Sequence, residues 1–214
     1  MPFNQEKIQL KKIEIHLLHY DSFHSIDYLD QLTEVEKERY FSFQHEHRKQ
    51  EFVATRVLRH RIFGFEHIHY NELGAPYIKD EGFISISHTK GTIGIAFCKN
   101  FQIGLDLEQI SSKAVRIAPK FLNEKEKEWL DMYSDEMMTK AWSAKETLYK
   151  IAGRKKIDFK KELQLLPSQN NFCIGSIKND GTTQSAEIHI FVQNNLVVSI
   201  NETPLKHDGR QEAF

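Results

Sequence analysis

The chain has 214 residues, of which 40% are hydrophobic and 28% are charged, and its formal net charge is −1. This length can bury a core as one domain or two small ones, and this composition is ordinary for a soluble globular protein. The near-zero charge excludes a protein that binds nucleic acid through an overall positive charge, so any anion site must be local.

The sequence carries no sign of a membrane segment or a secretory leader. No apolar run approaches the roughly 20 residues that cross a bilayer as a helix, and residues 1–7 lack the charged start and apolar core of a signal peptide. Cys98 and Cys173 are the only cysteines, and they fit neither a metal-ligand spacing nor a disulfide framework. We therefore expect a cytoplasmic protein that has no membrane contact and keeps both thiols buried and reduced.

The amino-terminal part predicts a strand followed by helices. Residues 13–17 alternate apolar and polar side chains, which is typical of a half-buried strand. Thr33 and Glu36 form a capping-box signature. We expect the helical region that starts there to break near His45 and to stop at Gly64.

After a turn at residues 73–76, the chain predicts alternating blocks of strands and helices. Strand patterns occupy residues 83–87, 92–98, 102–108, 172–177, 185–192 and 196–200. Helical patterns lie between these blocks, at residues 114–121, 124–132 and 135–152. Asn123 is expected to cap the second of these helices, Gly153 to end the third, and Asn194-Asn195 to form a hairpin turn.

Each half of the chain thus offers helices and about three strands. The fold class that follows is α+β (α/β), a pseudo-dimer of two similar halves, each a small antiparallel sheet packed on helices, with the active site between them. We place the halves at residues 1–103 and 104–201, and we expect residues 202–214 to form a disordered polar tail.

Two carboxylates in the segment 103–108 suggest a cation site. Asp106 and Glu108 lie two residues apart on a strand pattern, so their side chains share one face. Carboxylates held that close repel each other and favour a cation between them, and hard oxygen ligands suit a Mg²⁺ ion that also binds substrate phosphates. The alternative is a strand edge with two solvated acids, although the apolar residues at positions 103, 105 and 107 supply a buried face opposite to them.

A third acid lies on the longest predicted helix. Glu146 and Lys150 are four residues apart and therefore face the same way. Trp142, one turn earlier, adds an aromatic side chain to that face, which favours a partly buried site. The alternative is an exposed salt bridge worth a few tenths of a kcal/mol.

The amino-terminal half contains candidates for binding phosphate. Ser87 and His88 end a predicted strand, and both groups can donate hydrogen bonds to phosphate. They do not read as a hydrolase dyad, because adjacent strand residues point to opposite faces and the serine is not in a G-x-S-x-G elbow. A basic run on the second predicted helix offers either a phosphate patch or a solvated face balanced by acids, and its cations are Arg48, Lys49, Arg56, Arg59 and Arg61.

Three motifs together resemble the 4′-phosphopantetheinyl transferases of the surfactin-synthetase-activating (Sfp) type. They read FISISH at 83–88, IGLDLE at 103–108 and WSAKETLYK at 142–150, in the order and at the separations usual for that family. The resemblance covers roughly residues 33–159, and the combination of the three motifs is specific.

The resemblance implies two similar α/β halves that bind coenzyme A between them, and it implies a role for each matched residue. Mg²⁺, for which Mn²⁺ can substitute, would be held by Asp106, Glu108 and Glu146. Phosphates of coenzyme A would be contacted by Ser87, His88 and Lys145. The 3′-phosphate of the coenzyme would be bound by Arg48 and Lys49, with Arg56 or Arg59 as alternatives.

The implied reaction moves the phosphopantetheine arm of coenzyme A onto a serine of an acyl or peptidyl carrier protein and releases adenosine 3′,5′-bisphosphate. Glu146, or a metal-bound water that it orients, would act as the base. Lys150 would contact the phosphates and stabilise the leaving group. The pathway of the carrier protein stays open between fatty-acid, polyketide and non-ribosomal peptide synthesis and another carrier-dependent pathway. A monomer is expected, since a pseudo-dimer needs no second subunit.

Two other functions stay open at this point. A non-catalytic module of the same fold would bind coenzyme A or a carrier protein, and a Mg²⁺-dependent phosphohydrolase would use the same acids. Nucleic-acid binding is disfavoured, because the chain has no excess positive charge and no aromatic stacking motif around its basic run. The family often has a lysine where this chain has Ala75, for which Lys79 or the upstream arginines are candidate substitutes. It also often has a Gly-x-Gly where this chain has Gly153-Arg154-Lys155.

Overall fold

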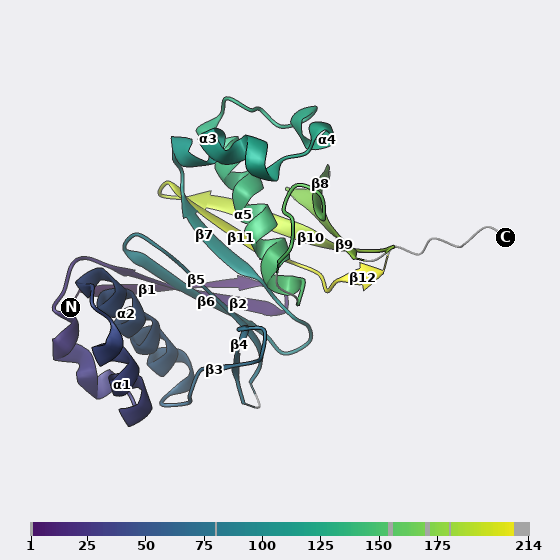
Figure 1. The fold of residues 1–214 in the computed structure, drawn as a ribbon. Helices are drawn as coiled ribbons and strands as arrows, with labels where there is room; N and C mark the ends of the chain where they lie inside the picture. The colour runs from purple at the N-terminus through teal and green to yellow at the C-terminus, as the bar shows by residue number, and fades with distance from the viewer. Residues whose placement is uncertain (1, 80, 154–155, 170–171, 180, 208–214) are drawn as a thin grey trace. The chain divides into compact units, whose positions relative to one another are not determined.

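The computed structural model describes residues 2–79, 81–153, 156–169, 172–179 and 181–207. The chain divides into two compact units, Met1–Asn100 and Phe101–Phe214. Each unit combines an antiparallel sheet with helices, which confirms the predicted α+β class (Figure 1). No helix in the described part of the chain is long and apolar enough to cross a membrane.

The first unit is built on a six-stranded antiparallel sheet in the order β1-β2-β6-β5-β4-β3. Its strands are β1 (Phe3–Leu10), β2 (Ile13–Tyr20), β3 (His69–Tyr70), β4 (Pro76–Ile78), β5 (Gly82–Thr89) and β6 (Thr92–Cys98). Its helical segments are the 3₁₀ helix η1 (Ser25–Gln31) and the α-helices α1 (Glu34–Ser42) and α2 (Glu46–Phe63).

Helices α1 and α2 begin and end where local sequence signals direct them. The Thr33 hydroxyl accepts a hydrogen bond from the Glu36 backbone, and the Glu36 carboxylate accepts one from the Thr33 backbone, so the predicted capping box is confirmed. His45 precedes α2, as the predicted break requires. Gly64 ends α2 with a φ of +66°, a conformation that favours glycine.

Apolar side chains of α2 form the core of the first unit with one face of its sheet. Val53 and Leu58 of α2 are fully buried and pack in one cluster with Leu18 of β2 and with Ile93 and Ile95 of β6. Each such side chain contributes roughly 1.5–3 kcal/mol when it is fully buried. Packing, more than helix propensity, therefore holds α2 on this sheet.

The second unit contains a five-strand path in the order β7-β11-β10-β9-β8, with β12 paired to β10. Its strands are β7 (Leu105–Gln109), β8 (Leu163–Pro167), β9 (Cys173–Asn179), β10 (Thr182–Gln193), β11 (Leu196–Asn201) and β12 (Lys206–His207). Its helices are α3 (Ser112–Phe121), α4 (Glu124–Lys127) and α5 (Asp135–Ile151).

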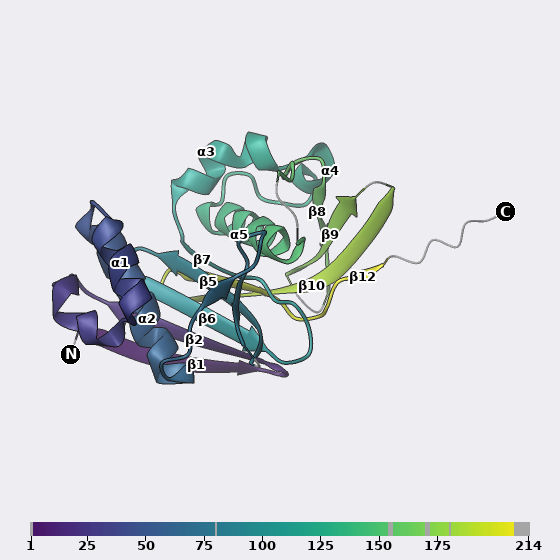
Figure 2. The same ribbon diagram turned by 60° about the horizontal axis from the view of Figure 1, so that its bottom comes forward.

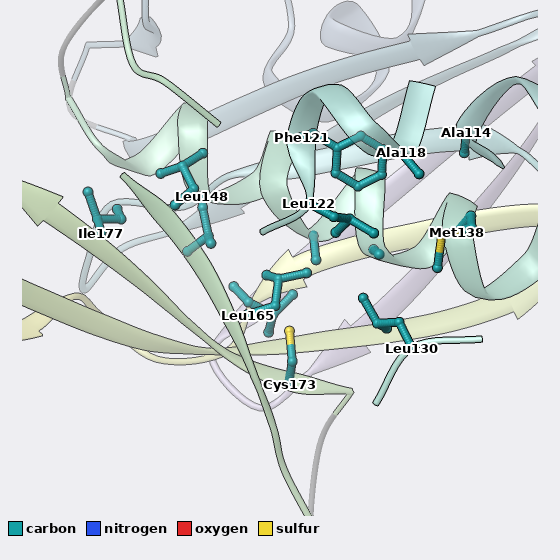
Figure 3. Packing of buried hydrophobic residues seen from close by; sticks show 14 of the residues in the cluster. Ala114, Ala118, Phe121, Leu122, Leu130, Met138, Leu148, Leu165, Cys173 and Ile177 are labelled. Carbon is teal, nitrogen blue, oxygen red and sulfur yellow. The ribbon is translucent and has the colours of Figure 1, made fainter. Parts of the chain in front are cut away.

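Helix α5 packs across the sheet of the second unit (Figure 2). Leu148 of α5 lies in one apolar cluster with Leu165, Cys173 and Ile177 of the sheet (Figure 3). A Cβ atom added to Gly175 would lie 2.6 Å from a methyl carbon of Leu148, so this leucine rests directly on the backbone of β9. Burial raises the pKa of the Cys173 thiol. Both cysteines are buried and free, as predicted.

Some elements differ from the sequence prediction. Strands β1 and β8 were not predicted, because their side chains do not alternate regularly between apolar and polar. The helix expected at residues 124–132 is only the single turn α4. The Asn123 cap is confirmed, but the chain then turns at Asp131, whose side chain accepts a hydrogen bond from the backbone of Tyr133.

The strand expected from residue 102 begins at Leu105. The hairpin between β10 and β11 does turn at Asn194 and Asn195, whose φ angles of +49° and +66° are those of a two-residue turn. The tail expected from residue 202 is ordered as far as His207, because β12 pairs with β10. Residues 208–214 lie outside the described part of the chain.

Candidate active site

The acids of β7 face helix α5. Ser143 of α5 donates a hydrogen bond from Oγ to Asp106 Oδ2 at 2.8 Å, and Trp142 donates one from Nε1 to Glu108 Oε1 at 2.7 Å. Both carboxylates therefore point to the same side of the strand, as the two-residue spacing predicted. Asp106 is buried and Glu108 is partly buried, so neither is a freely solvated edge acid.

Lys150 links the two elements from the last turn of α5. Its Nζ donates to Asp106 Oδ1 at 3.0 Å and to the backbone oxygen of Leu105. The lysine thus pairs with an acid of β7, and the exposed helix-surface salt bridge considered from the sequence does not describe its role. The Lys150 side chain is only 25% exposed, so it lies within the site.

The three carboxylates interact electrostatically. Burial, followed by repulsion from Asp106 and Glu108, raises the pKa of Glu146 to about 7 although Lys150 and Lys113 oppose the shift. Burial and Asp106 likewise raise the pKa of Glu108. The three carboxylates lie close enough to interact electrostatically, as expected where acids form a cation site.

Lys113 is a candidate residue that the sequence analysis missed. It is exposed in the first turn of α3, close enough to the acids to lower the pKa values of Glu108 and Glu146. The signal that could have found it is its place in the chain, four residues after β7 ends. A lysine next to an acidic site on a neighbouring element can help to bind the phosphates of a ligand.

The donor set fits a hard divalent cation. Three carboxylates from a strand and a facing helix supply the oxygen ligands that Mg²⁺ prefers. Their mutual repulsion favours the binding of a positive charge between them. Among the described residues, no three His, Cys, Asp or Glu side chains are arranged as a ready-made metal site. Some of the carboxylate oxygens instead accept hydrogen bonds from the helix.

The structure does not place Lys145 at a phosphate site. Its side chain is fully buried, and its Nζ lies within 2.9 Å of oxygens from four residues, Phe121, Glu126, Phe159 and Leu163. Consecutive helix residues differ by about 100° in direction, so Lys145 points into the core although its neighbour Glu146 belongs to the site. Burial lowers the pKa of Lys145, and Glu126 opposes that shift. The predicted phosphate contact of Lys145 is therefore corrected to a structural role.

Arg56 and its alternative Arg59 are also structural. Arg56 donates from Nε to Glu36 Oε1 at 3.1 Å, and Arg59 donates from Nη2 to Glu36 Oε2 at 3.0 Å. The Arg56 guanidinium also lies 3.8 Å from the centre of the Phe52 ring. All three charged side chains are less than 9% exposed, so the predicted phosphate contact of Arg56 is not supported.

Two of the remaining phosphate candidates of the first unit, Arg48 and His88, lie around one acid. Arg48 donates from Nη1 to Glu51 Oε2 at 2.8 Å, and His88 Nε2 lies 3.7 Å from the same oxygen. Residues from α2 and β5 are thereby brought to one acid, and the Arg48 side chain is 53% exposed. Lys49 Nζ lies 5.1 Å from the centre of the Tyr40 ring. Ser87 is buried on the opposite side of β5 from His88.

Of the two departures from the family pattern, the one at Ala75 lies on a loop. Asn71 Oδ1 accepts hydrogen bonds from the backbones of Leu73 and Ala75, so side-chain chemistry fixes this turn. Lys79 is exposed. Gly153 follows α5 with a φ of +65°, and residues 154–155 lie outside the described part of the chain.

The fold and the site together define an α+β protein whose second unit holds three interacting carboxylates and a lysine. Residues 102–201 match the family model described as the 4′-phosphopantetheinyl transferase superfamily. This range contains β7, α5 and all three acids. This match confirms the resemblance predicted from the motifs.

One similar protein is itself named as a 4′-phosphopantetheinyl transferase. The 4′-phosphopantetheinyl transferase gsp of Aneurinibacillus migulanus is 30% identical to this chain over 88 residues. The match covers 39% of this chain and 37% of that protein, so it spans little more than a third of the length of the relative.

Proposed function

We propose that this protein transfers the 4′-phosphopantetheine group of coenzyme A to a serine of an acyl or peptidyl carrier protein. The observation that carries the proposal is the set of interacting acids, Asp106, Glu108 and Glu146, with Lys150 among them. This set lies inside the segment that matches the transferase superfamily. The released product would be adenosine 3′,5′-bisphosphate.

Asp106, Glu108 and Glu146 would hold Mg²⁺, or Mn²⁺ in its place. When bound, the ion would offset the negative charge of the pyrophosphate of coenzyme A. Lys150 and Lys113 supply fixed positive charge beside these acids. Both would favour an anionic ligand there.

The transfer requires a base and a stabilised leaving group. The serine oxygen of the carrier would form a bond to the β-phosphorus, the bond from that phosphorus to the bridging oxygen would break, and the leaving bisphosphate would keep the electron pair. The serine proton would pass to Glu146 or to a water that Glu146 orients. The Lys150 ammonium would stabilise charge on the leaving oxygen.

In the first unit, phosphates of the coenzyme would be bound by Arg48, Lys49 and His88, whereas the buried Ser87 faces the other side of β5. Arg48 and His88 lie around one acid, and Lys49 is next to Arg48 on α2. A guanidinium, an ammonium and an imidazole are all donors that suit phosphate oxygens. The enzyme would act as a monomer in the cytoplasm.

The test is intact-mass analysis of an apo carrier protein incubated with this protein, coenzyme A and Mg²⁺, with a chelator control. A Mg²⁺-dependent gain of one phosphopantetheine group on the carrier is the expected result. No gain on carriers from fatty-acid, polyketide and peptide synthesis, with the protein folded and coenzyme A bound, would contradict the proposal and favour a binding module. Release of inorganic phosphate from coenzyme A without carrier modification would favour a phosphohydrolase.

A further inference from the structure

We propose that Ser143 and Trp142 are positioning residues that hold the carboxylates of Asp106 and Glu108 in the orientation that binds the divalent cation. The inference rests on the proposed function. It goes beyond that function because neither residue carries a charge or would contact the cation itself. It follows from two short hydrogen bonds that α5 donates to β7.

The Asp106 carboxylate is held at both oxygens by one helix. Ser143 Oγ lies 2.8 Å from Oδ2, and Lys150 Nζ lies 3.0 Å from Oδ1. The two donors are seven residues apart on α5, which is about two helical turns. Since Ser143 is fully buried, water does not compete with Asp106 for its hydroxyl. The plane of the carboxylate is therefore set by α5.

The Glu108 carboxylate is oriented by an indole that is itself held in place. Trp142 Nε1 lies 2.7 Å from Glu108 Oε1. The Trp142 ring meets Phe121 edge-on, with 5.2 Å between ring centres, and stacks on Phe159 at 5.5 Å. Because these rings restrict the indole, its N–H points in one direction. The donor can then fix the rotamer of the glutamate.

Uncharged donors suit this task. Buried carboxylates repel one another, and hydrogen bonds to their charged forms stabilise them in place. A serine and a tryptophan provide two of those bonds without adding to the positive charge that Lys150 already brings to Asp106. Groups that orient metal ligands in this way typically change metal affinity by roughly 10–100-fold when they are removed.

The experiment measures Mn²⁺ binding directly, from the electron paramagnetic resonance signal of free Mn²⁺, in Ser143→Ala and Trp142→Phe. Each variant removes one donor and keeps most of the packing. We expect each to bind Mn²⁺ at least roughly 10-fold more weakly than the wild type. The Mg²⁺ concentration for half-maximal carrier modification should rise by the same factor, while the rate at saturating Mg²⁺ should recover to within about 3-fold.

The chain offers a matched control for each variant. Ser176 is a buried serine of β9, a strand that β11 and β10 separate from β7, so Ser176→Ala removes an equivalent hydroxyl away from the acids. Trp129 packs on Phe172 at 6.1 Å, so Trp129→Phe removes an equivalent indole N–H. Both controls should retain the Mn²⁺ affinity and the Mg²⁺ requirement of the wild type.

The outcomes separate this inference from the proposed function. Wild-type Mn²⁺ affinity in both donor variants would overturn the positioning role and leave the transferase proposal intact. An equal loss of affinity in the controls would also overturn it, because general destabilisation would then explain the effect. A wild-type protein that neither binds Mn²⁺ nor modifies a carrier would overturn both. Should Ser143→Ala fail to fold, Trp142→Phe, which keeps an aromatic ring, decides.

Discussion

Glu146 links the chemistry of the site to the stability of the protein. Burial and the neighbouring acids raise its pKa in the folded state to about 7, whereas an unfolded chain has a glutamate pKa of about 4.3. Between these pH values, the folded protein keeps a proton that the unfolded chain has lost. The free energy of unfolding should therefore fall as the pH rises through this window and level off above pH 7.

Glu146→Gln should accordingly stabilise the metal-free protein at alkaline pH while it abolishes carrier modification. The expected gain is at most about 3 kcal/mol at pH 8, since glutamine avoids the cost of ionising a buried acid, and it should nearly vanish at pH 4.5. Urea denaturation with a chelator at both pH values measures the difference. An equal effect of the substitution at the two pH values would show that Glu146 does not titrate in this window.

Lys150→Ala tests the proposed role of the lysine at the leaving group. We expect kcat to fall roughly 100-fold at saturating Mg²⁺, because a positive charge that stabilises the developing charge is lost. The affinity for coenzyme A, measured by calorimetry, should change much less, since the lysine would act mainly in the transition state. An unchanged kcat would remove this role.

At the scale of elements, α5 combines the site with the core. Lys145 and Glu126 form a fully buried ion pair, and Glu126 also accepts hydrogen bonds from the backbones of Asn123 and Leu165. Lysine, glutamate and backbone groups therefore tie α5 to α4 and β8. Removing one member of such a pair leaves an uncompensated buried charge.

Lys145→Met should therefore lower the free energy of unfolding by about 3–5 kcal/mol. The double variant Lys145→Met with Glu126→Gln should recover part of that loss, because no unpaired charge then remains in the core. Urea denaturation measures both. If the Lys145→Met protein were stable but bound coenzyme A more weakly, this result would support the phosphate contact predicted for Lys145 from the sequence.

Gly104 sets how closely the chain entering β7 approaches α5. A Cβ atom at this position would lie 2.5 Å from the backbone oxygen of Thr147, and the Gly104 N–H donates to Asn201 Oδ1 at 2.8 Å. A backbone atom of a helix cannot move aside as a side chain can. The distance between the acids of β7 and the helix therefore depends on this glycine.

Gly104→Ala should destabilise the protein by about 1–3 kcal/mol and weaken Mn²⁺ binding. Gly175→Ala is the comparison, because the three atoms nearest to the added methyl group would all belong to the side chain of Leu148, not to a backbone. We expect a smaller stability loss there and unchanged Mn²⁺ binding, measured by thermal unfolding and metal titration. Equal effects of the two substitutions would contradict the role of Gly104 in the site.

At the scale of the whole molecule, a net charge of −1 provides no general attraction for a polyanion such as coenzyme A. In the proposed reaction, binding of the 3′-phosphate would then depend on a few local cations. Arg48 is the candidate of the basic run that is both exposed and close to His88 through Glu51.

Arg48→Ala should reduce the preference for coenzyme A over 3′-dephospho-coenzyme A by about 10-fold, as expected when a charge-assisted contact of about 1.4 kcal/mol is lost. Arg61→Ala, which removes an exposed arginine near the end of the same helix, serves as the control. Calorimetric titration with the two coenzymes measures the preference. The same preference in Arg48→Ala and in the wild type would exclude Arg48 as the 3′-phosphate contact.

Local signals determined much of the fold. The alternation at residues 13–17, the capping box at Thr33, the stop at Gly64 and the Asn194-Asn195 turn all act within a few residues, so one sequence reveals them. Strands β1 and β8 were missed because pairing with a neighbouring strand, rather than their own pattern, defines them.

The sequence by itself determined which residue types the chain offers, their spacing on a strand and a helix, and the resemblance that the family match confirms. Tertiary structure alone decided where each charged side chain goes. Lys145 and Arg56 turn inward because buried acids and carbonyl groups meet them there, whereas Lys150 meets Asp106. A helix presents every direction to its surroundings, so the elements packed against it select which residues become core and which become site.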